Sequence, residues 1–83
     1  MFEIVKKQEL NETVTLMEIQ APLIAKKAEP GQFIILRVDE KGERIPLTIA
    51  DFDREKGLVT IIFQIVGATT NKLNQLQVGD HLA

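Results

Sequence analysis

The chain is a succession of short runs rich in Val, Ile, Leu, Phe and Thr, each ended by a polar, glycine or proline break. Runs of this length and composition are typical of β-strands joined by turns. Short connections favour antiparallel pairing, and closure into a barrel removes exposed sheet edges. The pattern therefore predicts a mostly β fold, a small antiparallel Greek-key β-barrel. The expected strands are residues 2–10, 13–21, 32–38, 44–50 and 58–66, with the start of a sixth at 81–83.

One segment departs from this strand pattern and is predicted to be a short helix. Leu73 and Leu76 are three residues apart, which places them on one face of a helix over residues 70–76. The hydroxyl of Thr69 or Thr70 is expected to cap the start of that helix. No other segment has helical spacing, so residues 26–31, with the turn signal Pro30-Gly31, are expected to form a loop.

Two of the predicted strands carry more apolar residues than one buried face requires. Residues 58–66 are apolar on both faces, so this strand is expected to be the most buried. In the strand 13–21 the apolar positions change phase after Leu16, which favours a bulge or partial burial on both faces. The most polar connections, residues 39–43 and 51–57, are expected to be an exposed hairpin turn and an exposed loop.

Composition argues against several classes of function. The chain has 83 residues, enough for one domain, and no cysteine for a disulfide, a zinc finger or an iron–sulfur cluster. A net charge of -2 with only four aromatic residues, all Phe, argues against a nucleic-acid partner. No apolar stretch approaches the roughly 20 residues of a membrane span. No signal peptide is visible, so the expected location is cytoplasmic.

The strand 44–50 has an unusual outward face. Alternation divides it into a core face and an outward face: Ile45, Leu47 and Ile49 against Arg44, Pro46, Thr48 and Ala50. Proline is poorly placed in a central strand, because it removes a donor from the hydrogen-bond ladder. A flat, slightly apolar ligand with an anionic group would explain this face, with its ring on Pro46 and Thr48 and its anion at Arg44. An edge strand with a solvated outer face is the simpler alternative.

A second candidate site lies where the strand 58–66 runs into the helix. Gly67 is followed there by Ala68, Thr69 and Thr70. A helix start presents unpaired N–H groups that bind phosphate, and a glycine lets a phosphate approach the backbone closely. An ordinary strand-to-helix turn with a threonine cap is the alternative. The chain has neither of the glycine fingerprints of nucleotide sites.

Metal binding and nucleophilic catalysis have weaker candidates. His81 is the only histidine and is expected to be an ordinary strand residue. Asp51, Asp53 and Glu55 share one loop but lack the spacing of an EF-hand, so a solvated turn is expected. The chain has neither serine nor cysteine, and we expect no protein nucleophile and no metal site.

Taken together, the two candidate sites resemble a known family. Arg44-x-Pro-Leu-Thr-Ile, followed by Phe-Gln-Ile-Val-Gly-x-x-Thr-x-x-Leu from Phe63, resembles the flavin-binding barrel of the ferredoxin–NADP reductase superfamily. The sequence Pro-Gly-Gln-Phe that ends at Phe33 also fits. Within the superfamily the sulfide dehydrogenase branch (NADH-dependent ferredoxin–NADP oxidoreductase) matches best. The electron-transfer subunits of dihydroorotate dehydrogenase are a looser match.

The resemblance implies a role for each motif in binding FAD. Residues 46–50 would line the isoalloxazine ring, with Thr48 near its N5 edge. Arg44 would pair with the pyrophosphate, residues 64–66 would border the adenosine or ribityl part, and residues 67–70 would hold the pyrophosphate through N–H groups and a hydroxyl. The implied cofactor-binding residues are Arg44, Pro46, Leu47, Thr48, Ile49, Ala50, Gln64, Val66, Gly67, Ala68, Thr69 and Thr70.

The match to the family has two departures. Matching the serine of the plant-type Arg-x-Tyr-Ser motif to Thr48 puts its aromatic residue at Leu47 and its arginine at Ile45, one residue from Arg44. A one-residue offset reverses the face of a strand, so either the Thr48 face or the Leu47 face would meet the flavin. The second glycine of the family's phosphate turn is replaced here by Thr69.

The protein implied by the resemblance is larger than this chain. Family members continue with a nicotinamide-dinucleotide domain, and this branch adds cysteines for an iron–sulfur cluster. Residues 1–83 are therefore expected to be the FAD-binding barrel, the N-terminal part of an oxidoreductase that passes electrons between NAD(P)H and ferredoxin or a sulfur-compound acceptor. A second subunit is the expected partner, and the barrel alone is expected to be inactive. Two alternatives stay open: a protein- or oligonucleotide-binding barrel without flavin, and a fragment that binds nothing.

Overall fold

The computed structural model describes residues 2–29, 31–38 and 41–83, and its strands follow the predicted order. All the strand pairs are antiparallel, and the strand order across the sheet is β3-β4-β5-β2-β1-β6. Because β2 pairs with β5 and not with β3, the chain makes a Greek-key connection. The elements are β1 (Phe2–Asn11), β2 (Val14–Gln20), α1 (Pro22–Lys27), β3 (Phe33–Arg37), β4 (Arg44–Asp53), β5 (Leu58–Gln64), α2 (Ala68–Asn74) and β6 (His81–Leu82).

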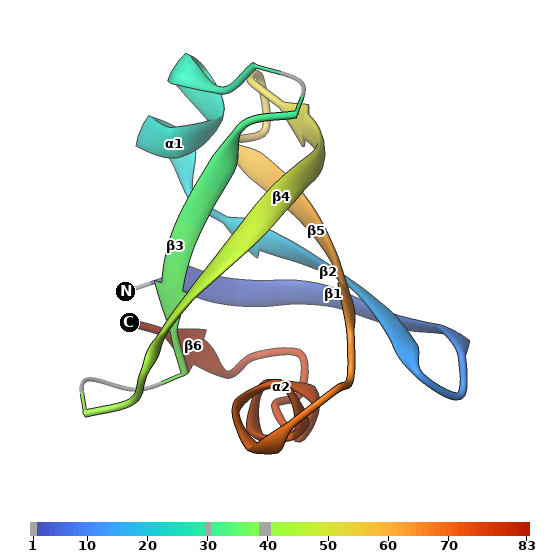
Figure 1. Cartoon of the computed structure of the whole chain (residues 1–83). Helices are drawn as coiled ribbons and strands as arrows, with labels where there is room; N and C mark the ends of the chain where they lie inside the picture. The colour runs from blue at the N-terminus through green and yellow to red at the C-terminus, as the bar shows by residue number, and fades with distance from the viewer. Residues whose placement is uncertain (1, 30, 39–40) are drawn as a thin grey trace.

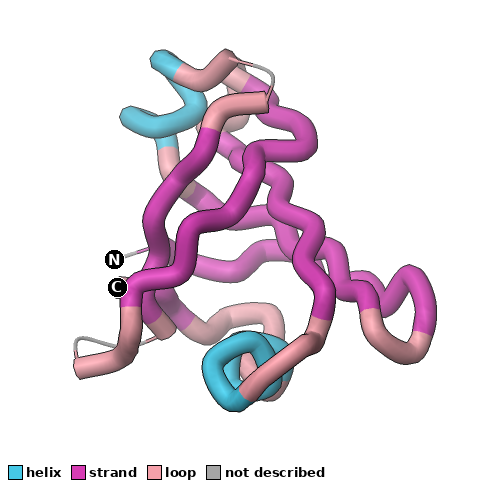
Figure 2. Tube along the Cα trace, in the orientation of Figure 1, coloured by secondary structure: helices cyan, strands magenta, loops and turns pink. Residues whose placement is uncertain are grey.

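The two ends of the sheet meet, so the sheet forms a nearly closed barrel (Figures 1 and 2). β3 and β6 are the outermost strands in the order, and the N–H of Ala83 donates to the carbonyl oxygen of Arg37 at 3.1 Å. The two chain ends lie near each other at this seam, and α1 and α2 lie at opposite ends of the barrel (Figure 1). The predicted mostly β, antiparallel barrel is confirmed.

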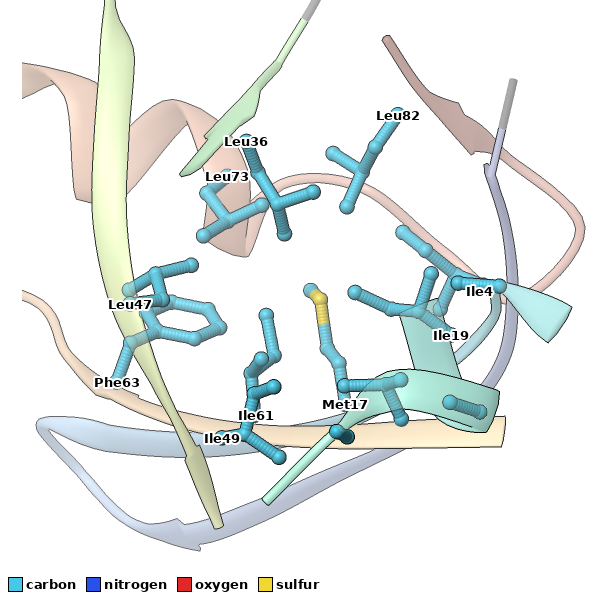
Figure 3. Packing of buried hydrophobic residues seen from close by; sticks show 14 of the residues in the cluster. Ile4, Met17, Ile19, Leu36, Leu47, Ile49, Ile61, Phe63, Leu73 and Leu82 are labelled. Carbon is cyan, nitrogen blue, oxygen red and sulfur yellow. The ribbon is translucent and has the colours of Figure 1, made fainter. Parts of the chain in front are cut away.

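The core of the barrel is built by inward side chains that alternate along each strand (Figure 3). Ile61 of β5 is fully buried at its centre. It pairs with Met17 of β2 on one side and with Ile49 of β4 on the other, and both of these residues are buried. Phe63 and Leu36 extend the same cluster. The core therefore joins all the central strands through a single apolar layer.

Helix α2 is held at one end of the barrel by three kinds of contact. Leu73 is fully buried. The Lys7 ammonium donates to the carbonyl oxygens of Asn74 at 2.5 Å and Leu76 at 2.9 Å, at the helix end where a cation is favourable. Thr15, which is buried, donates its hydroxyl to Oδ1 of Asn74 at 2.6 Å. A helix this short is not stable alone, so these contacts to β1 and β2 fix its place.

Residues 22–27 form a second helix, α1, where the sequence pattern predicts no helix. The predicted loop over residues 26–31 is therefore wrong at its start, because Lys26 and Lys27 end α1. Pro22 suits the first turn, since its φ is already helical and its missing N–H is not needed there. Only Ala25 of this helix is fully buried, so six residues give too little periodicity to reveal it.

The two strands with many apolar residues differ in how far their outward faces are buried. In β5 the outward Ile62 is 40% exposed, whereas β2 has no exposed residue, so the prediction that β5 is the most buried strand is wrong. In β2 Thr15 takes an inward position and the outward residues are all half-buried, so the predicted partial burial on both faces is confirmed. The register shifts lie in β1, at residues 4–6 and 9–11, and in β4, at residues 49–51. The outward face of β5 is consequently free to take part in a site.

The turn after β4 has a stricter sequence requirement than an open loop. β4 continues to Asp53, so the predicted loop 51–57 shortens to a tight turn in which Asp53 Oδ1 accepts from the N–H of Lys56 at 3.0 Å. Gly57 has a φ of +70°, and a Cβ there would lie 3.1 Å from Cβ of Pro22. Both features favour glycine at this position.

Three residues of the predicted turns, Pro30, Asp39 and Glu40, lie outside the described residues. Across the described ranges, no helix is long and apolar enough to cross a membrane.

Candidate functional site

Strand β4 separates its motif residues onto two faces, as alternation predicts. The buried pair, Leu47 and Ile49, points into the core (Figure 3). Their side chains are therefore unavailable to a ligand outside the barrel, and the Thr48 face is the side of β4 that is open. The exposed residues of this face are Arg44, Pro46, Thr48 and Ala50.

Exposed apolar side chains from the neighbouring strands flank this open face of β4. β3 pairs Phe33 with Thr48 and Ile35 with Pro46. Phe33 is 66% exposed and Ile35 is 64% exposed, and on the other side of β4 the outward Ile62 of β5 is also partly open. We call Phe33, Ile35, Pro46, Thr48 and Ile62 the apolar strip. The motifs gave no site role to Phe33, Ile35 and Ile62, because the register that sets them beside β4 is not visible in the sequence.

The turn between β5 and α2 has a glycine that the fold itself does not require. Gly67 precedes α2 with an extended φ of -170°, and a Cβ built there would have no other atom within 4 Å. The N–H of Asn71 makes the first intrahelical hydrogen bond, to the carbonyl oxygen of Gly67 at 2.9 Å. The N–H groups of residues 68–70 therefore precede the helical ladder. The turn leaves room for a group that approaches its backbone.

The two threonines of this turn have different partners. Thr70 Oγ1 accepts from the N–H groups of Val66 at 2.9 Å and Gly67 at 3.1 Å. Its hydroxyl therefore caps the start of α2 from the third helical position, which confirms a threonine cap, while the N-cap residue itself is Gly67. Thr69 Oγ1 donates to Oε2 of Glu43 at 3.0 Å. This contact ties the turn to the start of β4, beside Arg44.

The connection that leads into β4 and the start of α2 enclose a hollow of about 290 Å³. Lys41, Lys72 and Glu43 line it together with Ala68 and Thr69, so the hollow brings two cationic side chains and one carboxylate to the turn. Gln64 and Val66, the remaining predicted site residues, are exposed at the end of β5. The predicted residues thus gather on one side of the barrel, except for the buried side chains of β4.

The carboxylates of the turn after β4 have structural partners. Asp51 Oδ1 accepts from the N–H of Phe52 at 2.8 Å, and Asp53 caps the following turn. His81 lies exposed on β6. In the part of the chain that the structure describes, no three His, Asp or Glu side chains are grouped to hold a metal ion.

Comparison with known proteins gives matches along nearly the whole chain. The chain is 59% identical over 83 residues to the uncharacterized protein in the adh 3′ region of Clostridium beijerinckii, of which it covers 28%. It is 47% identical over 78 residues, or 94% of its length, to the dihydroorotate dehydrogenase B (NAD(+)) electron transfer subunit homolog of Thermotoga maritima, of which it again covers 28%. No protein-family model matches it.

A solved structure of NADH-dependent reduced ferredoxin–NADP oxidoreductase, described for flavin-based electron bifurcation, has the same fold. It matches 96% of this chain and 29% of its own chain at 46% identity, with a TM-score of 0.93. The chain is homologous to these proteins. The resemblance to the ferredoxin–NADP reductase superfamily is therefore confirmed. The chain spans less than a third of the length of these homologues.

Proposed function

We propose that the chain is the FAD-binding barrel domain of a longer oxidoreductase that transfers electrons between NAD(P)H and ferredoxin or a sulfur-compound acceptor. The observation that carries the proposal is the outward face of β4, where the exposed Arg44 adjoins the apolar strip that includes Pro46 and Thr48. Two homologues support the same function. One is named as an electron transfer subunit homolog, and the other is a solved structure described for flavin-based electron bifurcation.

The apolar strip is the proposed seat of the flavin ring. Pro46 offers a flat surface without an N–H donor, and the Thr48 hydroxyl offers one donor and an acceptor to a polar ring edge. Leu47 and Ile49 hold this part of β4 in place from the core side. When bound, FAD supplies the redox chemistry, and the protein supplies binding, orientation and electrostatics.

The pyrophosphate of FAD is proposed to lie between Arg44 and the turn after β5. The Arg44 guanidinium carries a permanent charge that suits a phosphate. The N–H groups of residues 68–70 and the open space beside Gly67 suit a close approach of phosphate oxygens. Gln64 and Val66 are proposed to border the ribityl or adenosine part.

The remaining parts of the proposed enzyme lie outside this chain. The chain has no cysteine, so an iron–sulfur cluster would be held elsewhere in the protein. A nicotinamide site would also belong to the rest of the protein, since the homologues are more than three times as long. A second subunit is the proposed partner, because the homologous proteins are named as subunits.

Arg44→Gln is expected to weaken FAD binding about tenfold, the effect of losing a charge-assisted hydrogen bond. Riboflavin lacks the pyrophosphate, so its affinity is expected to stay the same. Isothermal titration calorimetry of the two ligands measures both effects. Lys56→Gln is the matched control, because it removes an exposed cation from the turn at the other end of β4. If Arg44→Gln binds FAD as tightly as the unaltered chain, or loses as much riboflavin affinity as FAD affinity, the proposed role of Arg44 in binding the pyrophosphate is contradicted.

A further inference from the structure

Two exposed side chains of β3 extend the proposed flavin seat beyond β4. We propose that Phe33 and Ile35 form one wall of the site that holds the isoalloxazine ring. The inference rests on the proposed function and adds two ring-binding residues to it. No role in binding follows for either residue from the motifs of β4 or of the turn after β5.

The placement of these residues follows from the strand register. Phe33 lies directly opposite Thr48, and Ile35 lies directly opposite Pro46. Side chains opposite each other on neighbouring antiparallel strands have Cβ atoms about 5 Å apart on the same face. A planar ring that covers Pro46 and Thr48 would therefore reach the side chains of β3.

The exposure of Phe33 and Ile35 is not explained by the core of the barrel. Their neighbours along β3, Ile34 and Leu36, are the residues that point inward, and Leu36 is fully buried. Phe33 and Ile35 remain 66% and 64% exposed on the opposite face. The next outward position is Arg37, opposite Arg44, so the apolar surface ends where the cationic surface begins. Apolar groups beside a cation suit a ligand that joins an apolar ring to an anion.

The size of the apolar strip favours a ring over a protein as its occupant. The strip spans three strands, about 10 Å across, and extends over two outward positions, about 7 Å, along β3 and β4. A fused three-ring system is flat and apolar on its faces and covers an area of this order. A specific protein partner needs about 800 Å² on each side, far more than these five side chains offer. Phe33 adds an aromatic face or edge for stacking, which favours a π-system further.

The test is riboflavin binding by single-alanine variants of the folded chain, followed by quenching of flavin fluorescence. Riboflavin reports the ring without the pyrophosphate. Phe33→Ala and Ile35→Ala are each expected to weaken riboflavin about tenfold, because each removes an apolar contact with the ring. Their melting temperatures are expected to stay close to that of the unaltered chain, since both side chains are exposed. Leu23→Ala and Val78→Ala are the matched controls, being apolar and 79% and 58% exposed on other elements.

The outcomes separate this inference from the proposed function. Weaker riboflavin binding in the two β3 variants, with unchanged binding in the two controls, supports the wall. Unchanged riboflavin binding in all four variants would contradict the proposed contact of Phe33 and Ile35 with the ring, but it would leave the proposed flavin site on β4. An equal loss in all four variants would also contradict this contact. Loss of self-association in the β3 variants, measured by sedimentation, with flavin binding unchanged, would assign this face to a second copy of the chain. Failure of the unaltered chain to bind any flavin would count against the proposed function itself.

Discussion

Ile61→Ala is expected to lower the free energy of unfolding by about 2–5 kcal/mol, the effect of a cavity in a close-packed core. Ile61 is fully buried and lies between Met17 and Ile49, which are buried on the strands to either side. The truncation therefore leaves a void that neighbouring strands cannot fill without shifting. A chain of this length has roughly 4–12 kcal/mol of stability in total, so the variant is expected to lose a large fraction of it. Urea unfolding followed by circular dichroism measures the change.

Ile62→Ala is the matched control for this prediction. It makes the same chemical change one residue along the same strand, but Ile62 faces outward and is 40% exposed. Its effect on unfolding is expected to stay below about 1 kcal/mol. Equal losses of stability in the two variants would contradict the division of β5 into a core face and an open face.

Gly67→Asp is expected to abolish FAD binding, with a loss of about a hundredfold or more, while the barrel stays folded. The backbone at Gly67 is extended, and a Cβ there meets no other atom within 4 Å, so the fold tolerates a side chain. The carboxylate would instead occupy the proposed phosphate position and repel the pyrophosphate. Calorimetric titration with FAD, together with a thermal melt, separates loss of binding from loss of folding.

Gly67→Asn separates the charge of the new side chain from its size. The asparagine amide has the same shape as the carboxylate but no charge. The Gly67→Asn variant is therefore expected to bind FAD more weakly than the unaltered chain and more tightly than Gly67→Asp. Riboflavin is expected to bind all three proteins equally. Equal FAD affinity in the glycine and aspartate proteins would show that the phosphate does not lie at this turn.

The fold was largely predictable because strand positions follow from local composition. The breaks at Asn11-Glu12 and Lys56-Gly57 set the ends of strands correctly, and the alternation of β4 into Leu47 and Thr48 faces holds in the structure. Helix α1 was missed because it is six residues long and only Ala25 is fully buried. The burial of β5 was overestimated because its outward face carries apolar residues although it is open to solvent. The sequence pattern of an apolar strand face is the same whether that face is buried or exposed.

The candidate site was only partly predictable, because a sequence motif does not show how its strand pairs with the neighbouring strands. Arg44, Pro46 and Thr48 were found from the unusual composition of one strand face. Their neighbours Phe33 and Ile35 lie on a different strand, and only the β3–β4 pairing brings them to this face. The sequence left undecided whether the Thr48 face or the Leu47 face of β4 would meet a flavin. Because Leu47 is buried in the core, only the Thr48 face is accessible from outside the barrel.

The central claim, that this barrel carries an FAD site, is tested most directly by titrating the purified chain with FAD and with FMN. Flavin fluorescence and heat of binding would be followed in the same samples, with folding checked by circular dichroism. We expect FAD to bind more tightly than FMN, since only FAD brings a pyrophosphate to Arg44 and the turn at residues 67–70. A folded chain that binds neither flavin, or that binds both with equal affinity, would contradict the claim.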